Sequence, residues 1–134
     1  MLSPDLDTVR LGLHLLAAAV WVGGQLVLGA LLPVLRKAGP EVTRSAARTF
    51  ARVAWPAFGV LVATGIWNLA EVDFLDAGSD YQATVLVKLL LVAAAAMAVI
   101  VHTVGTSRKA LAIGGAVGLL ASLGAFFLGV LLRT

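Results

Sequence analysis

His14 and Lys88 are ionisable side chains that lie inside apolar runs of the sequence, LGLHLLAAAVWVGG and VLVKLLLVAAA. An ionisable residue within a membrane helix costs about 3 kcal/mol or more, so such residues usually face other helices and mark functional sites. An imidazole binds transition metals and haem iron, and a lysine without its proton is a possible second ligand. We therefore predict that His14 and Lys88 are metal ligands.

Both residues also have a structural alternative, in which His14 makes a polar contact between helices and Lys88 extends its ammonium group to the membrane interface. The other histidine, His102, lies near the opposite end of its helix. With a hydrocarbon core of roughly 30 Å, it would be about 20 Å from His14 along the membrane normal. We therefore do not expect the two histidines to bind one metal centre. A hydrogen bond to a neighbouring helix and a place near the headgroups are the alternatives for His102.

The segments that position these residues are strongly apolar. The chain has 134 residues, of which 60% are hydrophobic and 13% charged, and its mean hydropathy is +1.01. The hydrophobic fraction is higher and the charged fraction lower than in typical soluble domains. A helix needs about 20 apolar residues, each rising about 1.5 Å, to cross a membrane. The runs long enough to do so are residues 11–35, 53–70, 83–107 and 110–132.

We accordingly predict an all-α fold, an integral membrane bundle of four antiparallel helices in a single domain. Thr43 or Ser45 is the expected N-cap of the second helix. The predicted helices are residues 8–36, 44–70, 82–107 and 109–133.

The basic residues divide unevenly between the two sides of the predicted bundle. The first and third loops carry seven Lys and Arg residues, against two on the side of the termini. By the positive-inside rule these two loops are cytoplasmic. Both termini and the acidic loop EVDFLDAGSDYQ then lie outside, in a multi-pass protein of the inner (plasma) membrane. The seven residues are Arg36, Lys37, Arg44, Arg48, Arg52, Arg108 and Lys109.

Arg44, Arg48 and Arg52 recur every four residues along one helical face. We expect this stripe to anchor the second helix among lipid headgroups. Pairing with the propionates of a cofactor is the alternative.

Polar and aromatic residues accompany His14 at helical spacing. Ala18, Trp21 and Gln25 follow it at successive steps of four, three and four, and a polar stripe in lipid points inward. Thr64 and Asn68 lie near the outward end of the second helix. No catalytic residue is assigned. The predicted cofactor site consists of His14, Lys88, Trp21, Gln25, Thr64 and Asn68.

The pattern Gly114-x-x-x-Gly118-x-x-x-Ser122 in the fourth helix predicts close helix packing, either within the chain or between chains. In the second case it would support a homo-oligomer.

The runs LHLLAAAVWVGGQLVLGALLPVLR, RTFARVAWPAFGVLVATGIWN and VLVKLLLVAAA resemble the copper-resistance D (CopD) domain. In that family a His-x6-Trp-x-Gly-Gly helix, an Arg-x-Phe-x-Arg entry, a Thr-Gly near the second helix's end and a lysine opening the third helix recur. The resemblance covers about three of the four helices. It implies copper passage across the inner membrane from a periplasmic carrier.

The His-x6-Trp-x-x-Gly opening and the third-helix lysine also resemble the HemJ-type protoporphyrinogen oxidases, which bind haem b. In that family the first-helix histidine and the third-helix lysine are held to be essential, and they correspond to His14 and Lys88. The family's Glu-Arg pair at the second helix and its Asn-Glu-x-Pro segment do not occur in this sequence.

The residue inventory favours haem over copper. Copper(I) prefers sulfur ligands, yet the sequence has no Cys and only two Met. We predict a CopD-like, haem b-binding membrane protein for electron transfer or redox chemistry, and thus a possible haem-dependent oxidoreductase. A copper permease or uptake module, a HemJ-like oxidase and a structural assembly subunit are the alternatives. The expected partners are the lipid bilayer, a second copy of the chain, and a periplasmic copper carrier or redox partner; no nucleic acid is expected.

Overall fold

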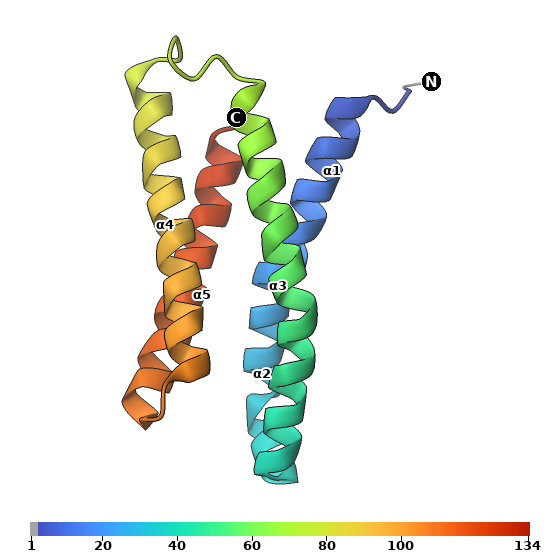
Figure 1. Ribbon diagram of the computed structural model, residues 1–134, viewed down its shortest axis with the longest axis vertical. Coiled ribbons are helices and arrows are strands. Elements are labelled where there is room, and N and C mark those ends of the chain that lie inside the picture. The colour runs from blue at the N-terminus through green and yellow to red at the C-terminus, as the bar shows by residue number, and fades with distance from the viewer. Residues whose placement is uncertain (1–2) are drawn as a thin grey trace. The chain divides into compact units, whose positions relative to one another are not determined.

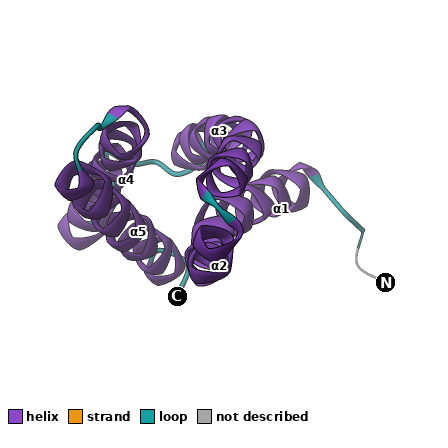
Figure 2. Ribbon diagram, turned by 90° about the horizontal axis from the view of Figure 1, so that it is seen from below, coloured by secondary structure: helices purple, strands orange, loops and turns teal. Residues whose placement is uncertain are grey.

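The computed structural model describes residues 3–134, and in that range every regular element is a helix (Figure 2). The predicted all-α fold is confirmed. Four helices are long and apolar enough to cross a membrane, as a multi-pass membrane protein requires. Many large apolar side chains point away from the protein, among them Leu90 at 71% exposure and Leu120 at 69%. The chain divides into a first unit that ends at Asp73 and a second unit, Phe74–Thr134. The prediction of a single domain stays a prediction.

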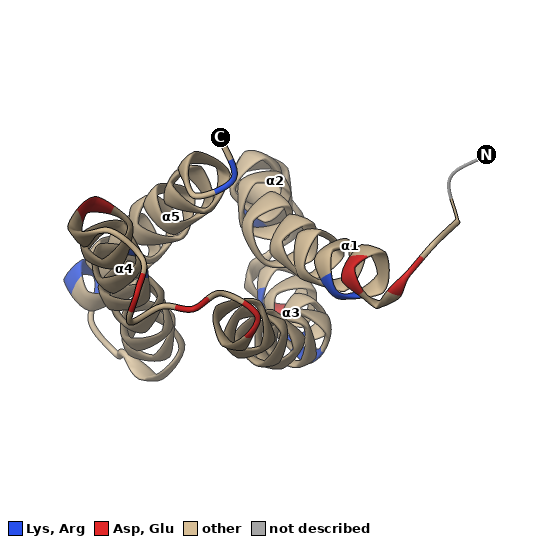
Figure 3. Cartoon of the chain, turned by 90° about the horizontal axis from the view of Figure 1, so that it is seen from above, with Lys and Arg blue, Asp and Glu red and all other residues tan. Residues whose placement is uncertain are grey.

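The first unit is a hairpin of two long helical segments (Figure 1). The first segment contains α1 (Leu6–Ala18), the π-helix η1 (Ala19–Gly23) and α2 (Gly24–Ala38), and α3 (Pro40–Ala70) returns alongside it. Figure 3 shows acidic and basic residues together at the start of α1, while most of each helix is uncharged.

Asp5 caps the first turn of α1. Its Oδ1 accepts hydrogen bonds from the Thr8 backbone N–H at 2.8 Å and from the Thr8 hydroxyl at 2.7 Å. The bond from the Thr8 side chain, followed by that from the Thr8 backbone, lowers the pKa of Asp5 below its ordinary value. The cap therefore stays charged at neutral pH, next to the positive end of the helix dipole.

The turn between α2 and α3 corrects the predicted start of the second membrane helix. Gly39 adopts φ +123°, a conformation that favours glycine, and Pro40 takes the first helical position, where its missing N–H costs nothing. The helix thus begins four residues before residue 44. Thr43 is not the N-cap, because it lies inside the helix and donates its hydroxyl to the Gly39 carbonyl at 3.1 Å. Ser45 lies inside the helix as well.

The second unit is a hairpin of α4 (Ser79–Val104) and α5 (Arg108–Leu131). Gly105 is extended and ends α4 three residues before the predicted boundary at 107. Ser107 instead caps α5, where its hydroxyl accepts a hydrogen bond from the Ala110 N–H at 3.1 Å.

The glycine pattern of α5 is a contact surface for α4 within the same chain. Gly114, Gly118 and Ser122 are all buried. A Cβ on Gly114 would lie 2.8 Å from the Ala98 carbonyl oxygen and 2.9 Å from the His102 backbone nitrogen. The absence of a side chain therefore permits this approach of the two backbones, and the prediction of close packing is confirmed within the chain. The predicted homo-oligomer stays a prediction.

Candidate functional site

His14 of α1 is joined to Thr64 of α3 by a hydrogen bond between Nδ1 and Oγ1 of 2.8 Å. The Thr64 side chain is buried, and its hydroxyl donates its single proton to the Val60 carbonyl at 2.7 Å, with the Leu61 carbonyl at 3.2 Å. With that proton on the carbonyl, the hydroxyl oxygen accepts from His14, and the matching tautomer carries its proton on Nδ1. In the neutral imidazole Nε2 is therefore the nitrogen with the lone pair.

The glycine after Thr64 lets the imidazole lie against α3. The His14 Cε1 atom is 3.6 Å from the position that a Cβ on Gly65 would occupy. His14 itself is half-buried. The Thr-Gly pair thus supplies both an acceptor for the imidazole and an open helix surface beside it.

Arg10 lies one helical turn before His14 and is the functional candidate that the sequence analysis missed. It is only 7% exposed, and its Nη2 atom lies 3.0 Å from an Asp7 carboxylate oxygen. Its Nη1 atom lies 3.7 Å from Glu71 at the end of α3. The guanidinium carbon is 5.9 Å from the centre of the Trp67 ring, and Trp67 donates to Glu71 at 3.1 Å.

The Arg10 cluster is a buried charge that links α1 to the end of α3. Among the residues that the structure describes, its Nε and Nη1 atoms are buried and have no hydrogen-bond partner. Arg10 is one of the two basic residues that the sequence analysis counted on the side of the termini, and it was given no further role there. Its spacing of three from Asp7 and four from His14 was the available signal, because such residues share a helical face.

Trp21 and Gln25 form a second cluster, about 10 Å along the helix from His14 at about 1.5 Å per residue. Trp21 is 3% exposed, and its ring centre lies 4.5 Å from that of Phe58 and 5.6 Å from that of Trp55. The Gln25 side-chain amide donates to the Trp21 carbonyl at 3.0 Å. Trp21 lies in the π-helix η1, and π-helices are rare elements that frequently occur at functional sites.

Asn68 lies one turn beyond Thr64 on α3 and is half-buried. The structure thus brings His14 and Thr64 into contact, and it places Asn68 on the same face of α3 as Thr64.

Lys88 and His102 belong to the second unit. The Lys88 side chain is half-buried and extends over α5, where its Nζ atom lies 3.0 Å from the position of a Cβ on Gly129. His102 Nδ1 is hydrogen-bonded to the Leu111 carbonyl at 2.5 Å, and its ring lies over Gly115. The hydrogen bond to a neighbouring helix, one of the two alternatives for His102, is therefore present. The pairing of His14 with Lys88 stays a prediction.

A cluster of His, Asp and Glu side chains is another arrangement that could hold a metal ion. Within residues 3–134, no group of three or more His, Asp or Glu side chains is gathered as a metal site. The candidate site is therefore the His14 imidazole, which lies within an apolar run and has a defined hydrogen bond to Thr64.

The fold and this site define a class: within residues 3–134 the protein is all-helical, with four helices long and apolar enough to cross a membrane and a histidine–threonine pair inside the first unit. Comparison with protein-family models, with curated proteins and with solved structures gives no significant match. The relationship to the CopD and HemJ families stays a prediction.

Proposed function

We propose that the chain is a CopD-like integral membrane protein that binds haem b through His14 and serves electron transfer or redox chemistry. The observation that carries this proposal is the hydrogen-bond chain from His14 Nδ1 through Thr64 to the Val60 carbonyl. Metal-binding histidines generally donate their other ring N–H to a fixed acceptor, which orients the ring and raises the basicity of the ligating nitrogen. The Thr64 hydroxyl is such an acceptor.

Haem fits these residues better than copper does. A porphyrin provides four nitrogen ligands to its iron, so one or two protein side chains complete the site. A copper site must draw its ligands from the protein, and sulfur is scarce in this chain, which has no Cys and two Met. Met97 is 61% exposed on α4. A copper permease therefore remains the less favoured function.

The roles of the side chains follow from their surroundings. His14 would hold the iron, Thr64 would keep the imidazole in the required tautomer, and Lys88 is the candidate for the second ligand. When bound, haem would supply one-electron transfer. Arg10 is already paired with Asp7 and lies near Glu71. We therefore assign it to holding α1 against α3 rather than to neutralising propionates.

Replacing Thr64 by Val tests the role of the hydrogen bond between His14 and Thr64. The variant keeps the side-chain volume but removes the acceptor for His14 Nδ1, so we expect the affinity for haem to fall about 10- to 100-fold. Titration of the purified apoprotein with haem, followed by the Soret absorbance, measures the change. Metal analysis of the same sample distinguishes iron in porphyrin from copper.

Two further variants control this experiment. Thr64→Ser retains the hydroxyl and should bind haem as the parent does. Thr43→Val removes a hydroxyl of the same helix that donates to the Gly39 carbonyl, so it should leave the titration unchanged. Unchanged binding in Thr64→Val would show that the hydrogen bond does not serve the cofactor.

We further propose that both termini face the outer side of the inner membrane. The uneven distribution of Lys and Arg between the connecting loops supports this orientation. A redox partner or a copper carrier would then approach from the periplasmic side, where His14 lies closest to the surface.

Single cysteines test the orientation in a chain that has none of its own. We expect Ser79→Cys, at the start of α4, to react with a membrane-impermeant maleimide in intact cells. Ala38→Cys, at the end of α2, should react only after the membrane is permeabilised. The reverse pattern would invert the topology and place His14 near the cytoplasmic side.

A further inference from the structure

The end of the first unit near Gly39 combines apolar and basic surfaces at one level. Its two helical segments have 33 and 31 residues, or about 50 Å and about 46 Å at about 1.5 Å per residue. Both lengths exceed the hydrocarbon core of roughly 30 Å. Toward this end α2 exposes Val27 at 60% and Val34 at 65%, whereas α3 carries exposed arginines.

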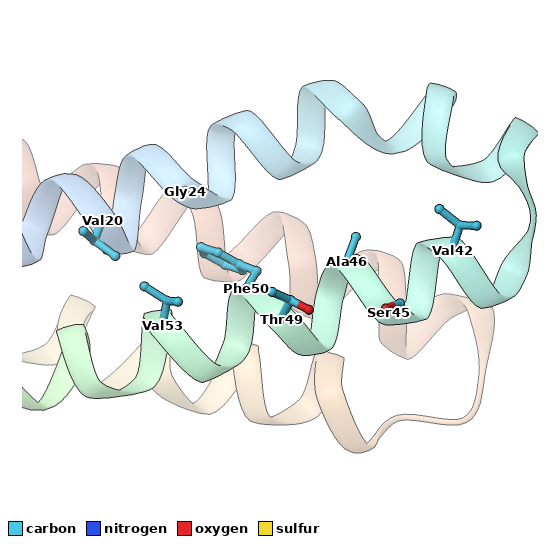
Figure 4. A pocket seen from close by; sticks show the side chains of 8 residues that line it. All are labelled: Val20, Gly24, Val42, Ser45, Ala46, Thr49, Phe50 and Val53. Carbon is cyan, nitrogen blue, oxygen red and sulfur yellow. The ribbon is translucent and has the colours of Figure 1, made fainter.

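An apolar groove runs between α3 and the segment formed by η1 and α2 at this end (Figure 4). Its volume is about 710 Å³, within the range of sites that hold small molecules. Figure 4 shows Val42, Ala46 and Phe50 pointing from α3 toward the opposite helix. A Cβ on Gly24 would collide with the Phe50 ring, so the glycine lets this ring form the floor of the groove.

A row of arginines borders the groove along α3. The lining residues Ser45, Thr49 and Val53 repeat every four positions. The residue before each of them is an arginine, and adjacent residues are about 100° apart around a helix. Arg44 is paired with Glu41 at 3.0 Å. Within the described part of the chain, Arg48 and Arg52 have no ion pair.

We propose that this groove binds one acyl chain of an anionic phospholipid, whose phosphate is held by Arg48 and Arg52. The hydroxyls of Ser45 and Thr49 lie between the arginine row and the apolar lining, where they can donate to phosphate oxygens. From Val42 to Val53 the groove extends about 16 Å along the helix, at about 1.5 Å per residue.

A bound lipid also suits the different surfaces of the two helices at this end, which are apolar on α2 and basic on α3. A bare bilayer edge at this level would leave either the arginines in hydrocarbon or the apolar face of α2 in water, and both are unfavourable. A phospholipid seated in the groove gives the arginines a phosphate and covers the apolar lining with hydrocarbon. The site thus depends on features of the first unit alone and is independent of any cofactor at His14.

Native mass spectrometry of the full chain in a nonionic detergent tests the proposal. The probes are dioleoyl phosphatidylglycerol, which is anionic, and dioleoyl phosphatidylcholine, which has the same acyl chains and no net charge. We expect an adduct of one phosphatidylglycerol and weaker binding of phosphatidylcholine. Arg48→Gln should weaken the phosphatidylglycerol adduct about fivefold, whereas Arg48→Lys should retain most of it.

A second variant tests the acyl chain separately from the phosphate. Ala46→Leu fills the groove and should weaken the adducts of both lipids without changing the ratio between them. Arg108→Gln removes a matched exposed arginine from the second unit and should change neither. Circular dichroism and size exclusion identify a variant that fails to fold. If Arg48→Gln fails to fold, the adducts of the two lipids are compared in Arg48→Lys instead.

Three results would overturn the proposal. Equal binding of the two lipids would remove the role of the arginines, and an unchanged adduct in Ala46→Leu would place the acyl chain elsewhere. A dimer of the chain that Ala46→Leu dissociates would show that a second copy, and not a lipid, occupies the groove.

Discussion

His14→Ala is expected to remove the cofactor from otherwise folded protein. In the proposed haem site the imidazole is the ligand and is hydrogen-bonded to the Thr64 hydroxyl, and a chain without cysteine has no thiolate to replace it. We expect the Soret absorbance per mole of purified protein to fall at least tenfold. The other histidine provides the matched control: His102 bonds to the Leu111 carbonyl in the second unit, so His102→Ala should retain the absorbance.

Size exclusion must accompany this comparison, because a packing defect would also release a cofactor. Gly65 lies beside the imidazole, and alanine at position 14 leaves a space there without introducing a clash. A well-folded His14→Ala protein with full cofactor content would show that His14 is a structural contact between α1 and α3.

Gly114→Val should disrupt the hairpin of the second unit. Even the first side-chain carbon would lie 2.8 Å from the Ala98 carbonyl oxygen and 2.9 Å from the His102 backbone nitrogen. These are backbone atoms and cannot rotate away, so α4 and α5 must separate. We expect a loss of roughly 3 kcal/mol, the upper part of the usual range for overpacked sites.

Denaturant titration of the purified protein, followed by circular dichroism, measures this loss. Ala116→Val is the matched control, since it adds a side chain of the same type to an exposed position of the same helix. It should leave the midpoint nearly unchanged. Equal midpoints for the two variants would show that the contact of α5 with α4 tolerates a side chain at Gly114.

The long helices were predictable because their apolar runs exceed the length that a membrane requires. Their ends depend on single residues and were less predictable. Thr43 and Ser45 are favourable N-caps by type, but Gly39 and Pro40 begin the helix earlier, through a positive φ and a residue that needs no N–H partner. Predicting this start required attention to backbone conformation rather than to capping side chains.

The candidate site was likewise predictable only in part. His14 could be recognised because it is an ionisable residue in an apolar run. Thr64 was included because it lies near the predicted outward end of its helix, as His14 does. The tautomer of His14 could not be predicted, since it depends on whether the Thr64 hydroxyl donates to a backbone carbonyl or to Nδ1. Arg10 was missed because a charged residue near a helix end is usually exposed, and its burial results from the tertiary contacts with Glu71 and Trp67.

The π-helix at Ala19–Gly23 also escaped prediction, because the letters AVWVG read as ordinary apolar helix. A π turn closes its hydrogen bond over one more residue than an α turn does. Deleting one residue from this segment would therefore shorten the turn to α while keeping the rotational phase between α1 and α2. A deletion in α2 itself would rotate everything after it by about 100°. The first long helical segment thus contains one stretch where a change of length leaves the His14–Thr64 pair and the groove near Phe50 on their original faces.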